Sequence, residues 1–197
     1  MGQDRFGYDK PFKYSADWYA DTYHHYEQPG NKVDPGPGIR AERDLSCLKA
    51  MGVTDGDRVL VPGCGGGHNI SLLKSSHKDL DIVGFDWSET VLDFCRSVFP
   101  DVSFVVASVS SFSHTQQFDR VVAFDFTEHL SLIDYIKFLN LCFGSLRPGG
   151  TVGVAPGMAI RPEHINIMHP CLIAHHLVQW GFRSVMGNLE WTTGVKP

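Results

Sequence analysis

Short apolar runs alternate with amphipathic segments along most of this chain. The apolar runs, rich in β-branched residues, predict strands at 58–62, 81–85, 103–107, 120–125 and 150–155. Apolar residues at helical spacing predict helices at 40–51, 67–75, 88–98, 131–145 and 170–180. The tail at 182–191 predicts one further strand, and the residues from Trp191 onward leave room for a short seventh. Alternating strands and helices favour an α/β three-layer sandwich around a mostly parallel sheet of six to seven strands.

The first 37 residues have a different character. They are polar, aromatic and rich in Gly and Pro, and Ser15 is placed to cap a short helix that ends near Glu27. This helix would carry four aromatic residues, Trp18, Tyr19, Tyr23 and Tyr26. We therefore divide the chain into an N-terminal aromatic lid or extension at 1–37 and one domain at 38–197. The aromatic face either packs onto the domain or closes over a ligand.

Composition narrows the class of partner. The 197 residues carry a formal net charge of −5 and no basic run, so a nucleic-acid partner is not expected. No apolar stretch approaches the roughly 20 residues of a membrane span, and the N-terminus lacks the apolar core of a signal peptide. The five cysteines are scattered without a Cys-x-x-Cys pair, which favours reduced thiols and a cytoplasmic setting.

The most informative motif is a glycine-rich turn after the first predicted strand. The run Val59–Val61 leads into Gly63, Gly65 and Gly67, and Asp86 ends the next strand 19 residues beyond Gly67. Glycines allow a sharp turn against which a ligand can lie, and an acid at that distance can accept hydrogen bonds from ribose hydroxyls. A dinucleotide turn would need its third glycine at position 68, which is His68. A nicotinamide-dependent oxidoreductase is therefore the less favoured interpretation.

The spacing of these glycines resembles that of the class I S-adenosylmethionine-dependent methyltransferases, and the order of motifs from about 40 to 185 is similar to theirs. Further segments resemble the family's later motifs: Phe104–Val109, Phe118–Leu130 and the turn Leu146–Val152. The resemblance implies a Rossmann-like fold, S-adenosyl-L-methionine as cofactor and transfer of its methyl group. It also implies a set of cofactor-binding residues, namely Pro62, Gly63, Cys64, Gly65, Gly67, Asp86, Trp87, Ser108, Val109 and Phe124.

Two positions depart from the family pattern. Val61 stands where many members have an acid, and Ser108 stands where an Asp commonly binds the adenine amino group. A neutral hydroxyl can still pair with this amine, although such a bond is weaker than a charge-assisted one. The Val-Pro-Gly-Cys-Gly form of the turn, at 61–65, resembles that of some methyltransferases acting on small molecules.

Two acid–histidine pairs follow the fourth and fifth predicted strands. These are Glu128-His129 and Glu163-His164, and the segment 163–170 resembles a Glu-His-x-x-x-x-x-Pro element of the small-molecule branch. His129 or His164 is a candidate general base because histidine titrates near neutral pH. The other interpretation is that both histidines are structural. Asp125 and Glu128 are expected near the substrate.

The remaining histidines do not form a metal-binding pattern. No His-x-x-x-His lies on a convincing helix face with a partner acid, so no metal site is predicted.

The sequence thus predicts transfer of a methyl group to the oxygen or nitrogen of a small-molecule acceptor. One alternative is a methyltransferase that modifies RNA or protein, because such an enzyme would have the same cofactor-binding motifs. The other is a protein that binds the cofactor without catalysing a reaction. A homodimer is possible if the sheet keeps an unpaired edge.

Overall fold

The computed structural model describes residues 39–115, 117–159 and 163–197. The predicted lid at 1–37 lies outside the described residues. Five α-helices are described: α2 Ile39–Met51, α3 His68–Ser76, α4 Glu89–Val98, α5 Leu132–Ser145 and α6 Pro170–Gln179. A 3₁₀ turn, η2, spans Thr127–His129. The strands are β1 Arg58–Pro62, β2 Asp81–Asp86, β3 Ser103–Val106, β4 Phe118–Phe124, β5 Leu146–Ala155, β6 Arg183–Gly187 and β7 Thr192–Val195.

The helix starts follow from local chemistry that the sequence contains. The Ser88 hydroxyl accepts the Val91 N–H at the start of α4, and the Ser131 hydroxyl accepts the Asp134 N–H at the start of α5. Pro170 occupies the first turn of α6, where its missing N–H costs nothing. These caps explain why the predicted and observed helix starts nearly coincide.

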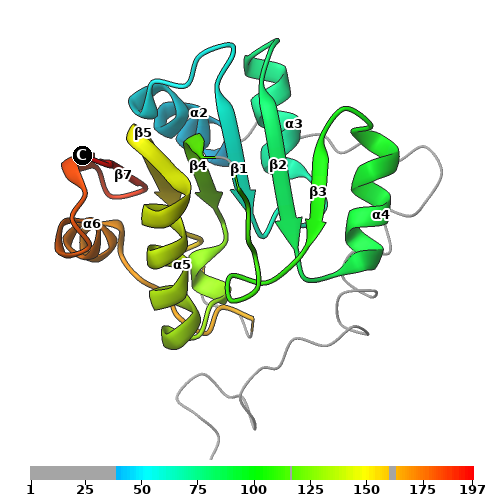
Figure 1. The fold of residues 1–197 in the computed structure, drawn as a ribbon. Coiled ribbons are helices and arrows are strands. Elements are labelled where there is room, and N and C mark those ends of the chain that lie inside the picture. Colours follow the sequence, from blue (N-terminus) through cyan, green and yellow to red (C-terminus); the bar gives the residue numbers. More distant parts are fainter. Residues whose placement is uncertain (1–38, 116, 160–162) are drawn as a thin grey trace, which may run out of the picture.

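All seven strands form one sheet in the order β3-β2-β1-β4-β5-β7-β6 (Figure 1). Strands β1 to β5 run parallel to one another, whereas β7 runs antiparallel to both β5 and β6. The predicted sheet of six to seven mostly parallel strands is confirmed. The strand predicted at 182–191 is present as the shorter β6, the short seventh strand predicted from Trp191 onward is β7, and the two form an antiparallel hairpin. Asn188 makes the turn: its side-chain oxygen accepts the N–H groups of Glu190 and Trp191.

Apolar side chains cover both faces of the sheet. On one face Val59 and Val61 of β1 join a core with α2, α3 and α4, while Leu60 points to the opposite core with α5 and α6. Alternation of this kind follows from the two-residue period of a strand. Because β1 is buried on both faces, the residues directly after it are held in a fixed position.

The sheet order also decides where a ligand can lie. The chain leaves β1 toward β2 and β3, then crosses back to place β4 on the other side of β1. A crevice opens at such a reversal, at the carboxyl ends of the strands. Strand β6 lies at one edge of the sheet, and the homodimer stays a prediction. Within the described residues, every helix falls short of the length and apolarity that a membrane crossing requires.

Candidate functional site

A cavity of about 340 Å³ lies at the carboxyl ends of four neighbouring strands. Residues at the carboxyl ends of β1, β2, β3 and β4 or soon after them line it, together with one residue of α5. They are Gly63, Gly65, Phe85, Asp86, Trp87, Ala107, Ser108, Val109, Asp125, Phe126, His129, Leu130 and, from α5, Asp134. Its volume is within the range of small-molecule sites. It coincides with the place that the sheet reversal indicates, so we take it as the candidate site.

The glycine turn forms one wall of this cavity. Gly63 adopts a φ of +56° and Gly67 a φ of +84°, a region that residues with a side chain rarely enter. A Cβ at Gly63 would overlap the ring of Phe126, so the turn also needs a glycine for space. The thiol of Cys95 donates to the carbonyl oxygen of Gly65 at 3.1 Å. Helix α4 therefore helps to hold the turn, a contact that sequence reasoning missed.

Asp86 lies at the end of β2 with its carboxylate against the glycine turn. Its Oδ2 accepts the Gly65 N–H at 3.1 Å, and its Oδ1 accepts the Ser88 N–H at 3.0 Å. Burial raises the pKa of Asp86, while these backbone donors partly offset the shift. A carboxylate has about four acceptor positions. Asp86 therefore keeps capacity for hydroxyl groups of a ligand.

Trp87 and Ser108 line the opposite side of the cavity. Trp87 is 42% exposed, unusually high for so large an aromatic residue. The Ser108 hydroxyl accepts the Ser110 N–H at 3.2 Å and lies 3.2 Å from the Ser111 hydroxyl. Ser108 thus holds a tight turn after β3, and Val109 lies beside it in the cavity wall. The structure brings these three residues to the cavity as predicted from the sequence.

Asp125 follows β4 and is held in a left-handed conformation, with a φ of +48°. Arg43 of α2 supports it, because Nη1 of Arg43 donates to Asp125 Oδ1 at 3.3 Å and to the Pro156 carbonyl at 3.2 Å. Arg43 also donates to Asp44 through Nε at 2.7 Å. Sequence reasoning missed Arg43, which lies 82 residues before Asp125 and belongs to no motif.

Several predicted residues do not line the cavity. Phe124 is 2% exposed and packs in the core, and Phe126 takes the place at the cavity that was expected for it. The end of β4 at Phe124 and the turn at Asp125 explain this difference, because Phe126 lies beyond the strand and does not follow its alternation. Cys64 and Gly67 are buried within the turn, as is Pro62 before it. Their contribution to the site is the path of the backbone.

Glu128 is completely buried, although it was expected to lie near the substrate. Neither of its carboxylate oxygens makes a hydrogen bond with any described group. Burial raises the pKa of Glu128 to about 8, although the nearby backbone N–H groups of Glu128 and Gly157 oppose this shift. Glu128 therefore lies behind the cavity wall, in contrast to Asp125.

The two candidate catalytic histidines meet next to Glu128. The rings of His129 and His164 lie with their centroids 4.8 Å apart and nearly perpendicular. Burial, together with the neighbouring His164, lowers the pKa of His129 to about 4, so His129 is neutral near pH 7. Of the two histidines, His129 lines the cavity. The structure thus joins both acid–histidine segments, which lie more than 30 residues apart.

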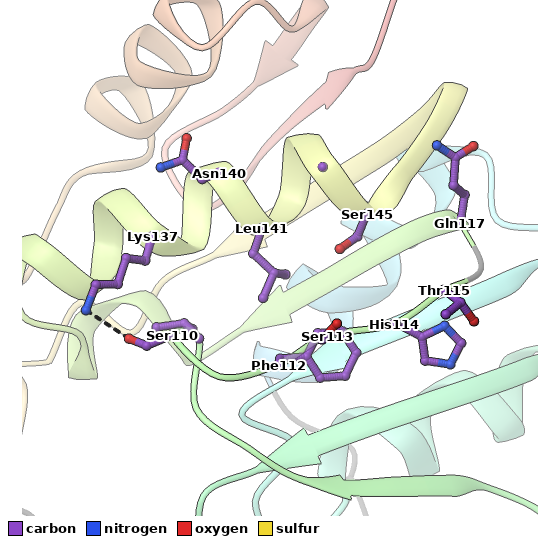
Figure 2. A pocket seen from close by; sticks show the side chains of 12 residues that line it. Ser110, Phe112, Ser113, His114, Thr115, Gln117, Lys137, Asn140, Leu141 and Ser145 are labelled. Carbon is purple, nitrogen blue, oxygen red and sulfur yellow. Dashed lines mark hydrogen bonds between the residues drawn. The ribbon is translucent and has the colours of Figure 1, made fainter.

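A second and larger depression, of about 680 Å³, lies between α5 and a segment that includes residues 109–115 and Gln117 (Figure 2). Its wall is mostly polar, and the Lys137 ammonium donates to the Ser110 hydroxyl at 2.9 Å and to Asp134 at 3.3 Å. Lys137 and Ser110 are exposed, and the residues that line this depression do not include those of the glycine turn. We therefore favour the smaller cavity, where the buried acid and the turn converge.

Comparison with known proteins matches the same region. Residues 59–150 match the family model described as a methyltransferase domain. A trans-aconitate 2-methyltransferase of Methylobacterium radiotolerans is 28% identical over 150 residues, which are 76% of this chain and 53% of that protein. The chain spans about half the length of the curated relatives it matches.

Solved structures share the fold. A TehB-like S-adenosylmethionine-dependent methyltransferase from Corynebacterium glutamicum superposes with a TM-score of 0.65 at 17% identity, over 92% of this chain and 98% of that one. Phosphoethanolamine N-methyltransferase 2 from Haemonchus contortus, in complex with S-adenosyl-L-methionine, gives a TM-score of 0.68 at 17% identity, over 93% of this chain and 58% of that one. Together with the motif order, the family model and the curated relatives, these findings lead to one conclusion. They support the identification of this chain as a class I S-adenosylmethionine-dependent methyltransferase.

Proposed function

We propose that this protein transfers the methyl group of S-adenosylmethionine to the oxygen or nitrogen of a small-molecule acceptor. One observation carries the proposal: a single cavity joins the glycine turn, the buried Asp86 and the histidine that follows β4. The residues expected to bind the cofactor and the candidate general base thus line the same cavity.

The residues present fit the cofactor. Asp86 retains acceptor capacity after its two backbone hydrogen bonds, which suits a pair of ribose hydroxyls. Trp87 offers an exposed indole face to the adenine, with Ser108 and Val109 at its edge. The turn Gly63–Gly67 leaves bare backbone for the rest of the molecule. When bound, the cofactor would supply a methyl group attached to a positively charged sulfur, so that a bond from the acceptor to the methyl carbon replaces the carbon–sulfur bond and the sulfur leaves as a neutral thioether.

The acceptor is inferred to be small for two reasons. The curated relatives are named for trans-aconitate, a small organic acid. The described residues that line the cavity include no lysine or arginine, and the net charge is −5, so the basic surface that a nucleic acid needs is not evident in the described part. The general-base role of His129 or His164 stays a prediction, as do the cytoplasmic setting and the lid at 1–37.

A ligand-induced thermal shift tests the cofactor. Ligand at 100 times its Kd adds about 2.7 kcal/mol to the free energy of unfolding, or a rise in Tm of roughly 5–10 °C for a domain of this size. We expect this rise with S-adenosylmethionine and with S-adenosylhomocysteine, and none with NAD. A shift with NAD alone would overturn the proposal in favour of an oxidoreductase.

Turnover tests the acceptor class. The full chain is incubated with S-adenosylmethionine and small organic acids (trans-aconitate included), phenols or amines, and formation of S-adenosylhomocysteine is followed. We expect acceptor-dependent formation with one of these classes. Cofactor binding with turnover only on RNA or protein would instead support the macromolecular alternative. Binding without turnover on any acceptor would support a non-catalytic protein.

A further inference from the structure

We propose that Glu128, His129 and His164 hold a divalent transition-metal ion beside the cavity. One ligand atom of each residue lies within 4.8 Å of the others. Two of these residues belong to η2 after β4, and the third belongs to the segment after β5. The sequence predicted no metal site because neighbouring histidines lacked ligand spacing. That reasoning did not cover ligands that two separate segments bring together.

The hydrogen bonds of the two histidines indicate which ring nitrogen carries the proton. Nδ1 of His129 lies 3.2 Å from the Glu163 carbonyl oxygen, and Nδ1 of His164 lies 2.6 Å from the Ala159 carbonyl oxygen. A carbonyl oxygen only accepts, so each Nδ1 must donate. Each Nε2 then carries the lone pair. Histidines that bind metals are commonly oriented by such a bond from their other nitrogen to a carbonyl.

Glu128 supplies the third ligand and an independent reason for a cation. Its side chain is completely buried, and both oxygens lack a hydrogen-bond donor among the described residues. Oε1 lies 3.9 Å from His129 Nε2, too far for a shared proton to form a hydrogen bond. A Cβ at position 157 would overlap this oxygen, so Gly157 leaves space for the carboxylate. A buried carboxyl group that forms no described hydrogen bond and two imidazole rings therefore converge.

The donor set indicates the kind of ion. Two imidazole nitrogens and one carboxylate oxygen suit Zn²⁺, Fe²⁺, Mn²⁺ or Co²⁺ better than Ca²⁺ or Mg²⁺, which prefer oxygen ligands. Bond lengths of about 2.0–2.2 Å would require the three ligand atoms to draw closer by roughly 1 Å. Three protein ligands leave a position for water or for an oxygen atom of a small molecule. Only the suggestion that the acceptor takes this position depends on the proposed function.

Metal binding is tested first on the unaltered full chain. The protein is stripped with a chelator, loaded with one equivalent of Zn²⁺ and studied by X-ray absorption, and Co²⁺ is used as an optical probe. We expect two imidazole ligands and further oxygen at about 2.0 Å, with no thiolate absorption from Co²⁺. Sulfur neighbours at about 2.3 Å, or no tight binding of either ion, would overturn the proposal. These readouts need neither a variant nor an acceptor.

Variants then locate the site. Glu128→Gln and His164→Ala are each expected to weaken Zn²⁺ binding at least 100-fold in competition with a chromophoric chelator. His175→Ala is the matched control, because His175 is exposed on α6 and lies outside the cluster. Undiminished binding by both cluster variants would place the ion elsewhere and overturn the assignment. The thermal shift with S-adenosylhomocysteine, measured without metal, shows whether each variant is folded and tests the cofactor proposal separately.

Discussion

Replacing Asp86 by asparagine is expected to raise the Kd for S-adenosylmethionine about 100-fold. In the proposed function, the Asp86 carboxylate accepts two ribose hydroxyls, and hydrogen bonds to a charged group contribute about 1.5–3 kcal/mol each. Asparagine keeps the shape but has one acceptor oxygen and no charge. A loss of about 2.7 kcal/mol corresponds to the expected 100-fold change. Isothermal titration calorimetry measures the Kd directly.

We expect Asp86→Asn to remain folded, so that a higher Kd reports lost contacts with the cofactor and not unfolding. One of the two backbone donors, Gly65 N–H or Ser88 N–H, loses its acceptor. Burial raises the pKa of Asp86, so its ionised form is disfavoured in the fold and a neutral side chain offsets part of that loss. We expect the Tm of the ligand-free protein to change by only a few degrees. Asp93→Asn, on the exposed surface of α4, is the control with unchanged Kd. A Kd for Asp86→Asn within threefold of the original would remove Asp86 from the cofactor site.

Replacing Gly67 by alanine is expected to lower the free energy of unfolding by about 2–5 kcal/mol. Gly67 precedes α3 with a φ of +84°, and an L-residue in this region costs roughly 1–2 kcal/mol. The added Cβ would also lie 2.6 Å from Cε2 of Phe99 and 3.4 Å from the Cys95 sulfur. Overpacking of a buried site adds about 1–3 kcal/mol. Urea unfolding measures the sum.

Alanine substitutions at two other glycines distinguish the cost of backbone strain from the cost of overlap by the added Cβ. Gly56 has a φ of +90° but open space where a Cβ would lie, so Gly56→Ala is expected to lose only about 1–2 kcal/mol. Gly144 has open space and lies in α5, so Gly144→Ala is expected to gain about 0.5–1 kcal/mol. If Gly67→Ala proves no less stable than Gly56→Ala, the contact with Phe99 does not constrain the turn.

Local signals explain how much of the fold was predictable. Strands such as 58–62 and 81–86 are short apolar runs between polar segments, and Ser88 and Ser131 mark helix starts by hydrogen bonds to nearby N–H groups. In the tail both strands were predicted, but the first is shorter than expected: β6 ends at Gly187, and Asn188 makes the turn into β7.

Only part of the candidate site was predictable from the sequence. The cofactor wall was predictable because a strand, a glycine turn and Asp86 are adjacent along the chain and one βαβ unit places them together. The support of Asp125 by Arg43 was not, because its parts lie 82 residues apart. Neither was the exchange of Phe124 for Phe126, which depends on where β4 ends and the chain turns.

The sequence by itself determined the order of elements, the glycine turn and the class of cofactor, because each depends on residues within one or two neighbouring elements. Only the tertiary structure decided that the buried Glu128 shares one cluster with His129 and His164. Their meeting requires β4 and β5 to pair in a particular register, so that the segments after them approach each other. It also requires Gly157 to leave space for a carboxylate. Such long-range packing has no counterpart in local spacing, which is why the histidine pairs could be found in the sequence but not their common site.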